Sequence, residues 1–151
     1  MKYITQEGLE KAKTELEKRK RVTRREVASA IKEAKEQGDL SENAEYTEAK
    51  RQQRENEGRI IQLENIIRTS EVVTNNGNKD IVSIGSEIEV ENAGKKMFFH
   101  IVGSNEADPL KGKISNESPI GRAFLGKKKG EEFKVTLPNR NIVEYKIVDI
   151  K

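Results

Sequence analysis

Two kinds of hydrophobic spacing divide this chain near residue 75. Between residues 5 and 71, apolar side chains recur at steps of three and four, the spacing of one face of an α-helix. The recurring positions are Leu9, Ala12, Leu16, Val27, Ile31, Ala34, Ile60, Leu63 and Ile67. Beyond residue 75, short segments alternate apolar and polar residues, which is typical of strands. We therefore expect two architectures joined in one chain.

The first half is expected to form a hairpin of two long helices. Gly38 interrupts the helical spacing, and glycine tolerates the left-handed conformation that follows a helix end. Thr5 is expected to start the first helix and Ser41 the second, because a hydroxyl there can accept a hydrogen bond from the first turn. Each run of roughly 30 residues would form a rod on the order of 40 to 45 Å. A rod of that length suggests reach into another molecule.

The middle of the expected hairpin is polar. If the runs close symmetrically about the turn, Arg19, Lys20 and Thr23 face a polar stretch of the return run. That stretch contains Gln52, Gln53 and Asn56. We expect this part of the seam to be weakly held. Gly58 adds a cost of roughly 1 kcal/mol relative to alanine, and it is compatible with a close helix crossing or with a bend.

The second half is expected to be a small antiparallel sheet with one helix. Strands are predicted at residues 86–91, 97–102, 132–137 and 142–150. Pro138 lies between the last two strands, as expected of a hairpin turn. A short helix is predicted from Pro119 to Leu125, because proline suits a first turn and Gly126 suits the position after the last. The whole chain is therefore assigned to the α+β class.

Composition limits the classes of protein that remain. Charged residues make up 36% of the chain and hydrophobic residues 33%, which is too polar for one thick core. The net charge of +3 is modest, so any contact with nucleic acid should be local. The chain has no cysteine and no apolar run near the length of about 20 residues that spans a bilayer. We expect a cytoplasmic protein without a membrane partner.

The turn between the two helices carries the most distinctive chemistry. Asp39 and Glu42 lie three residues apart, and magnesium is typically held by one or two carboxylates together with waters and phosphate oxygens. The two carboxylates can supply only part of such a shell, and metal-dependent phosphodiester hydrolysis uses a second cation. Any catalysis would have to be completed by a partner. The alternative is that Asp39, Ser41 and Glu42 only favour the positive end of the second helix.

Two separate motifs resemble those of a known family. The stretch from Gly38 to Tyr46, continuing as Ala49 and Lys50, resembles the tip signature of bacterial Gre-type transcript cleavage factors. Residues 114–123 resemble their C-terminal signature. The resemblance covers essentially the whole chain and is closest to the GreA branch. It implies an N-terminal antiparallel coiled coil, residues 1–75, and a C-terminal domain similar to FK506-binding proteins (FKBP-like), residues 76–151.

The resemblance also implies a function and roles for the turn. The C-terminal domain would dock on RNA polymerase, and the coiled coil would enter the secondary channel and reach the 3′ end of backtracked nascent RNA. There Asp39 and Glu42 would help hold a Mg²⁺ ion that is bound only within the polymerase complex. The supporting tip residues would be Ser41, Asn43, Glu45 and Tyr46. The chain would be an accessory factor and a monomer, not an enzyme.

Two further surfaces are candidates for contact with the partners. A basic run of Lys18, Arg19, Arg21, Arg24 and Arg25 can attract RNA phosphates, or it is merely a solvated helix face. The family commonly has Arg-Arg-Pro after this run, whereas Glu26 follows Arg25 here, which leaves the position of the RNA contact open. The expected polymerase-docking residues are Asp108, Pro109, Ser115, Ser118, Pro119, Ile120 and Arg122.

Other functions remain as alternatives. The resemblance also allows a protein that occupies the same channel and inhibits polymerase without cleavage, and the hairpin alone allows a generic coiled-coil adaptor. Peptide-bond isomerase activity is not expected, because a fold does not carry a function. The aromatic residues available to a pocket are about what the core requires, namely Phe98, Phe99, Phe124, Phe133 and Tyr145. His100 is expected to be a strand residue and not a metal ligand.

Overall fold

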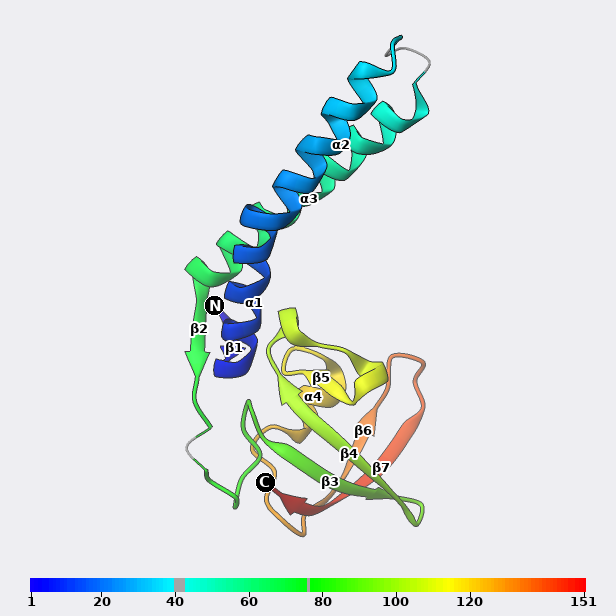
Figure 1. Cartoon of the computed structure of the whole chain (residues 1–151). Coiled ribbons are helices and arrows are strands. Elements are labelled where there is room, and N and C mark those ends of the chain that lie inside the picture. The colour runs from blue at the N-terminus through cyan, green and yellow to red at the C-terminus, as the bar shows by residue number, and fades with distance from the viewer. Residues whose placement is uncertain (40–42, 76) are drawn as a thin grey trace. The chain divides into compact units, whose positions relative to one another are not determined.

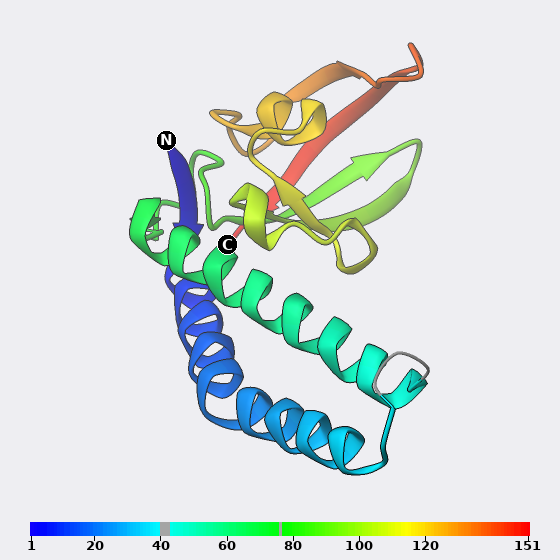
Figure 2. The same cartoon turned by 90° about the horizontal axis from the view of Figure 1, so that it is seen from above.

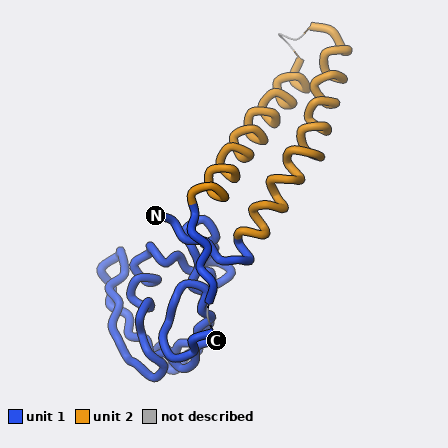
Figure 3. The backbone as a smooth tube through the Cα atoms, turned by 90° about the vertical axis from the view of Figure 1, so that its left-hand side faces the viewer, with its two compact units in different colours: residues 1–8, 70–151 blue, residues 9–69 orange. Residues whose placement is uncertain are grey.

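A computed structural model describes residues 1–39, 43–75 and 77–151. It contains two compact units, a hairpin unit of residues 9–69 and a sheet unit of residues 1–8 and 70–151 (Figure 3). The sequence predicts a domain boundary after residue 75. The structure instead assigns both ends of the helical half to the sheet unit, because β1 (Lys2–Thr5) pairs in parallel with β2 (Ser70–Val73).

Three helices and a short π-helical turn build the hairpin. The outgoing run consists of α1 (Gln6–Lys18), the π-helical turn η1 (Arg19–Thr23) and α2 (Arg24–Glu36). The returning run is a single helix, α3 (Ala44–Thr69), which lies beside α2 (Figures 1 and 2). The α+β assignment and the helical N-terminal half are confirmed, whereas the spacing of apolar residues does not predict the π-helical turn. None of the described helices is both long and apolar enough to cross a membrane.

Capping side chains explain where the helices begin and end. The Thr5 hydroxyl accepts a hydrogen bond from the Gly8 N–H at 3.0 Å, as expected of the residue before α1. Gly38 follows the end of α2 with a φ of 110°, as predicted. The predicted start of the second helix at Ser41 is wrong, because α3 begins at Ala44 and Asn43 accepts from the Tyr46 N–H at 3.1 Å. Ser41 itself lies outside the described residues.

The seam of the hairpin contains small and medium-sized side chains. Ala12, Val27 and Ala34 are buried on the outgoing run. The buried positions of α3 are Ala49, Asn56, Ile60, Leu63 and Ile66. The predicted Ile67 is only half-buried, and Ile66 takes its place. A Cβ built at Gly58 meets no atom within 4 Å, so a close helix crossing does not explain this glycine.

The sheet unit contains a five-stranded sheet in the order β5-β4-β3-β7-β6. Its strands are β3 (Glu87–Asn92), β4 (Lys95–Val102), β5 (Lys113–Ser115), β6 (Glu132–Thr136) and β7 (Ile142–Ile150). All neighbours are antiparallel except β4 and β5. The four predicted strands and the β6–β7 hairpin are confirmed, whereas β1, β2 and β5 are additional.

One apolar core closes the sheet unit. The helix α4 (Pro119–Phe124) contributes Phe124, which is fully buried in a cluster with strand residues such as Ile101 and Ile147. The Phe124 ring lies 5.2 to 5.6 Å, between centroids, from the rings of Phe99, Phe133 and Tyr145. Phe98 is 67% exposed, so its predicted place in the core is wrong. It alternates with Phe99 along β4, and only Phe99 points toward the core.

The N-terminal strand is attached to the same unit by a polar contact. Glu106, in the 3-10 turn η2 (Ser104–Glu106), accepts from the Thr5 N–H at 2.7 Å and from the Thr5 hydroxyl. A Cβ at Gly8 would collide with the Glu106 carboxylate, and one at Gly103 would lie 1.8 Å from the Tyr3 carbonyl oxygen. Residues 1–8 thus pack tightly within the sheet unit, against residues 103–106.

Candidate functional site

The tip of the hairpin is organised by Asn43. Its side-chain oxygen caps α3, and its side-chain amide donates to the Ala34 carbonyl oxygen, near the end of α2, at 2.7 Å. One side chain therefore ties the end of the outgoing run to the start of the return. Asp39 and Glu45 are exposed, and Tyr46 is half-buried. Ser41 and Glu42 lie outside the described residues.

Two carboxylate side chains near the tip, those of Asp39 and Glu45, are exposed. Among the described residues, no group of three or more His, Cys, Asp or Glu side chains is arranged to hold a metal ion. Asp39 supplies the kind of oxygen ligand that Mg²⁺ prefers. The predicted pairing of Asp39 with Glu42 as metal ligands stays a prediction, because Glu42 lies outside the described residues.

Two of the five predicted RNA-contacting residues bind the other helix. The Arg24 guanidinium makes a two-pronged ion pair with Glu57 on α3, at 2.7 and 2.8 Å. The Arg19 guanidinium donates to the Asn56 side chain at 3.2 Å and to Glu15 at 2.8 Å. The basic run by itself does not reveal these acidic partners. Spacing offers a signal for one of them, since Glu15 and Arg19 are four residues apart on one helix face.

The other three basic residues lie on the surface. Arg21 pairs loosely with Glu17, with 3.6 Å between nitrogen and oxygen and both side chains mostly exposed. Lys18 and Arg25 are exposed and form no ion pair with any residue that the structure describes. These three side chains remain available to an anionic partner, whereas Arg19 and Arg24 are already engaged.

Glu15 is the most strongly perturbed group in the seam. The hydrogen bond from Arg59 on α3 lowers its pKa to about 2, with a smaller contribution from Arg19, although partial burial acts in the opposite direction. The Arg59 guanidinium contacts both carboxylate oxygens at 2.8 and 2.9 Å. The carboxylate thus stays ionised at neutral pH and holds two arginines from opposite helices.

The predicted docking residues gather around β5. Asp108 exchanges two backbone hydrogen bonds with Lys113, at 2.9 and 3.0 Å, which closes the turn that carries Pro109. Leu110, on the 3-10 turn η3 (Pro109–Lys111), is 99% exposed. Its only signal in the sequence is an apolar side chain within a polar turn, which does not distinguish it from a core residue.

The segment after β5 is built from close polar contacts. The Ser118 hydroxyl donates to the Ser115 carbonyl oxygen at 2.7 Å and accepts from the Gly121 N–H at 3.0 Å, which caps α4. Pro119 and Arg122 are exposed, and Ile120 packs against the core. These serines therefore shape the turn, and Pro119 and Arg122 are left on its surface.

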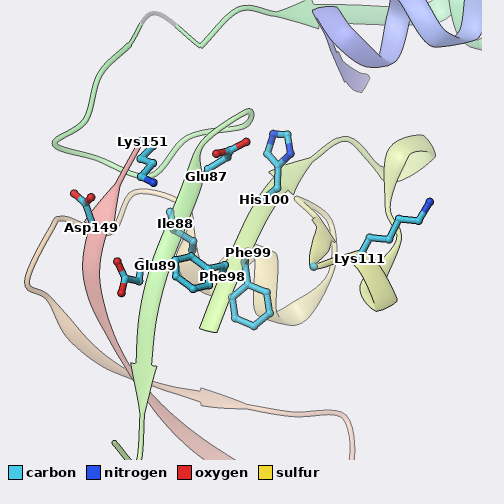
Figure 4. A pocket seen from close by; sticks show the side chains of 10 residues that line it. Glu87, Ile88, Glu89, Phe98, Phe99, His100, Lys111, Asp149 and Lys151 are labelled. Atoms are coloured by element: carbon cyan, nitrogen blue, oxygen red, sulfur yellow. The ribbon is translucent and has the colours of Figure 1, made fainter. Parts of the chain in front are cut away.

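The outer face of the sheet forms a shallow depression of about 140 Å³ beside Phe98 (Figure 4). Its rim includes Glu87 and Glu89 on β3, His100 on β4 and Asp149 on β7. His100 is a strand residue, as predicted. The Asp149 carboxylate pairs with Lys129, whose hydrogen bond lowers the pKa of Asp149. Four of the five aromatic rings that were expected in the core lie there, namely those of Phe99, Phe124, Phe133 and Tyr145.

Two family models match the chain, one in each half. The model described as "Transcription elongation factor, N-terminal" matches residues 2–72. The model described as "Transcription elongation factor, GreA/GreB, C-term" matches residues 77–151. Together they cover nearly the whole sequence.

Individual relatives match over almost their full length. Transcription elongation factor GreA of Acetivibrio thermocellus is 47% identical over 151 residues, 98% of this chain and 94% of that protein. GreA of Clostridium novyi is 48% identical with the same coverage. The crystal structure of GreA factor homolog 1 of Thermus thermophilus aligns with a TM-score of 0.44 and 27% identity, over 99% of this chain and 97% of that one.

Proposed function

The chain belongs to the GreA/GreB family of transcription elongation factors, and we propose that it inserts its hairpin into the secondary channel of RNA polymerase. Factors of this family stimulate cleavage of the transcript by polymerase, so the chain is an accessory protein and the catalytic centre belongs to its partner. The observation that carries the proposal is the acidic tip, where Asp39 is exposed and Asn43 hydrogen-bonds to Ala34 and to Tyr46.

The tip is proposed to act through its carboxylates. Asp39 and Glu42 would complete the coordination of a Mg²⁺ ion held mainly by polymerase, and the ion would activate water toward the RNA. Asp39 can serve this role because its side chain is exposed at the end of the hairpin. Asn43, Glu45 and Tyr46 would support the turn, and Asn43 does so by its hydrogen bonds to both helices.

The RNA contact is proposed to use the three residues of the basic run that do not bind α3. Lys18, Arg21 and Arg25 are exposed and can approach the phosphates of an extruded 3′ end. Arg19 and Arg24 would contribute indirectly, because their guanidinium groups hold the outgoing run against α3. This divides the five predicted residues into a contacting set and a bracing set.

The sheet unit is proposed to dock on polymerase as a monomer. The proposed surface is the Asp108–Pro109 turn together with the segment 115–122, whose exposed members include Pro119 and Arg122. Docking would raise the effective concentration of the tethered hairpin, and such tethering can increase occupancy by about 10²-fold or more.

Stalled elongation complexes provide the test. We expect the chain to shorten the backtracked transcript in Mg²⁺ when polymerase is present and to leave free RNA intact when it is absent. Inhibition without shortening would favour the alternative of a channel-occupying inhibitor. Failure to bind polymerase at all would overturn the proposal and favour a generic coiled-coil adaptor.

A further inference from the structure

One polar side chain is buried in the seam of the hairpin. Asn56 is 3% exposed, and it is the only buried polar side chain among the described residues of the hairpin unit. Ala49 and Leu63, seven residues before and after it, are also buried. Asn56 therefore occupies a position in the seam where the neighbouring pattern calls for an apolar residue.

Both ends of the Asn56 amide bind one residue of the opposite run. The side-chain oxygen accepts from the Arg19 guanidinium at 3.2 Å, and the side-chain nitrogen donates to the Arg19 carbonyl oxygen at 3.3 Å. The same carbonyl oxygen accepts from the Arg24 N–H, which closes the π-helical turn. Since a buried amide is costly unless it is hydrogen-bonded, this location is favourable only when Arg19 stands opposite.

The apolar part of the seam does not select one axial register strongly. Its fully buried outgoing side chains are Ala12, Val27 and Ala34, which are small enough to accept several facing positions, and the larger Leu16 and Ile31 are only half-buried. A single buried asparagine can fix the register of paired helices, at some cost in stability. Asn56 meets that description, because its partner is a backbone carbonyl at one height along the outgoing run.

The ion pairs around Asn56 hold the helices together without the same selectivity. Arg24 pairs with Glu57, and Lys20 pairs with Glu64 at 2.5 Å, all with side chains well exposed to water. Exposed pairs of this kind contribute little, and their long side chains can follow a shift of the helix. The short, buried Asn56 side chain cannot follow such a shift of the helix.

We infer that Asn56 is a positioning residue that fixes the axial register of α3 against the π-helical turn at Arg19. The inference rests on the proposed function, because the register determines how the two helix ends present the tip. A slip of one helical turn would displace α3 by about 5.4 Å along its axis. A misplacement of even about 1 Å can cost 10²-fold in rate at a reacting centre.

The first experiment measures the register directly. Because the chain has no cysteine, spin labels can be placed on exposed Val22→Cys and Ile61→Cys and their separation measured by pulsed EPR. We expect a single label-to-label distance in this labelled parent. After Asn56→Leu we expect a second population with a different distance, in which α3 is shifted by about 5 Å along its axis. Gln52→Leu makes the same chemical change on an exposed position of α3 and should retain the parental distance.

The second experiment relates the register to function in the unlabelled chain. Asn56→Leu should melt at the parental temperature or above, because an apolar residue replaces a buried amide. Its saturating rate of transcript cleavage should fall about tenfold or more, with the half-maximal concentration nearly unchanged. Asn56→Ala removes both hydrogen bonds without adding volume, and it provides the same measurement if the leucine variant does not form the hairpin.

The outcomes separate this inference from the proposed function. A parental distance in both Asn56 variants would overturn the inference, as would a displaced register with a parental cleavage rate. If the unmodified chain stimulated no cleavage, the proposed function would be wrong, and the EPR distances would still decide whether Asn56 fixes the register.

Discussion

The hairpin and the sheet unit are closed by different interactions. In the sheet unit, Phe124 and its aromatic neighbours fill a continuous apolar core. In the hairpin, apolar contacts alternate with a buried amide and with ion pairs such as Arg59–Glu15. A core of the first kind resists change through packing, whereas a polar seam depends on charge and register. The two helices of the hairpin are therefore held together by a seam with few large apolar side chains.

The largest effect is expected at the tip, where chemistry and stability should separate. Asp39→Asn and Glu42→Gln keep the shape of each side chain but remove its charge. We expect either substitution to reduce stimulated cleavage by roughly 10²-fold, as for groups that support a catalytic metal, with no change in melting temperature. Competition binding should show parental affinity for polymerase, since we propose that the sheet unit makes the docking contact.

The matched control is Glu36→Gln, which removes an exposed carboxylate at the end of α2. It should cleave like the parent. If both Asp39→Asn and Glu42→Gln stimulated cleavage like the parent, the proposal that the tip carboxylates bind the metal ion would be wrong.

Substitutions on the docking surface of the sheet unit should change the affinity for polymerase and leave the saturated cleavage rate unchanged, which is the opposite of the effect expected at the tip. Arg122→Glu reverses an exposed charge on α4 within the proposed docking surface. We expect the concentration needed for half-maximal cleavage to rise about tenfold, which corresponds to a loss of about 1.4 kcal/mol in binding, while the saturated rate stays the same. Titration of stalled complexes measures both quantities.

A control for Arg122→Glu lies on the edge strand β6, which is outside the segments proposed for docking. Lys134→Glu reverses an exposed charge on β6, outside the proposed surface. It should leave the titration curve unchanged. A reduced saturated rate for Arg122→Glu at parental affinity would place this surface in the chemistry and contradict the division between the two regions.

Sequence periodicity identified the elements that are long or strongly patterned. The long helices and the strands β3, β4, β6 and β7 carry enough residues for the spacing to be distinctive. β1, β2 and β5 have four, four and three residues. Such short strands form only by pairing with distant segments, so no local sequence pattern predicts them.

The site was predictable in its motif residues but not in their supports. Asp39 follows directly from an acidic turn after Gly38, and the structure leaves it exposed there. The capping role of Asn43 was not assigned, because asparagine and serine are comparable at that position and only the backbone selects between them. The engagement of Arg24 by Glu57 depends on the register of two helices. No property of either helix alone contains that information.

A moderate effect is expected from acid on the hairpin seam. The folded pKa of Glu15 is about 2, below its ordinary 4.5, so its contribution to stability is present above pH 4.5 and is lost as the pH falls toward 2. Because the side chain is one-third exposed, we expect about 1 kcal/mol and not the full value of the shift. Urea unfolding followed by far-UV circular dichroism measures it.

The comparison of Glu15→Gln with the parent isolates that contribution. The variant should be less stable near neutral pH, and the difference should vanish near pH 2. Glu17→Gln serves as the control, since Glu17 forms only a loose, exposed pair with Arg21. A constant difference between Glu15→Gln and the parent across this range would show that Glu15 acts through packing and not through its charge.

The smallest effect is expected from replacing one glycine by alanine in each of the two regions. Gly58 lies on an exposed face of α3, and an added Cβ meets no atom within 4 Å. Gly58→Ala should therefore stabilise the hairpin by about 0.5 to 1 kcal/mol, because alanine loses less backbone entropy in a helix. In the sheet unit, a Cβ at Gly121 would lie 1.9 Å from the Ser115 carbonyl oxygen, so Gly121→Ala should destabilise the chain.

The opposite signs follow from space alone, since both glycines are helical and neither has a positive φ. Urea titration of both variants measures the changes, and Gly58→Ala should also keep the parental cleavage rate. A destabilised Gly58→Ala variant would mean that the helix needs local flexibility there, in the form of the bend that the sequence allows. In that case the polar seam would depend on a pliable α3 as well as on its ion pairs, and the contrast with the packed sheet unit would be larger than the contacts alone indicate.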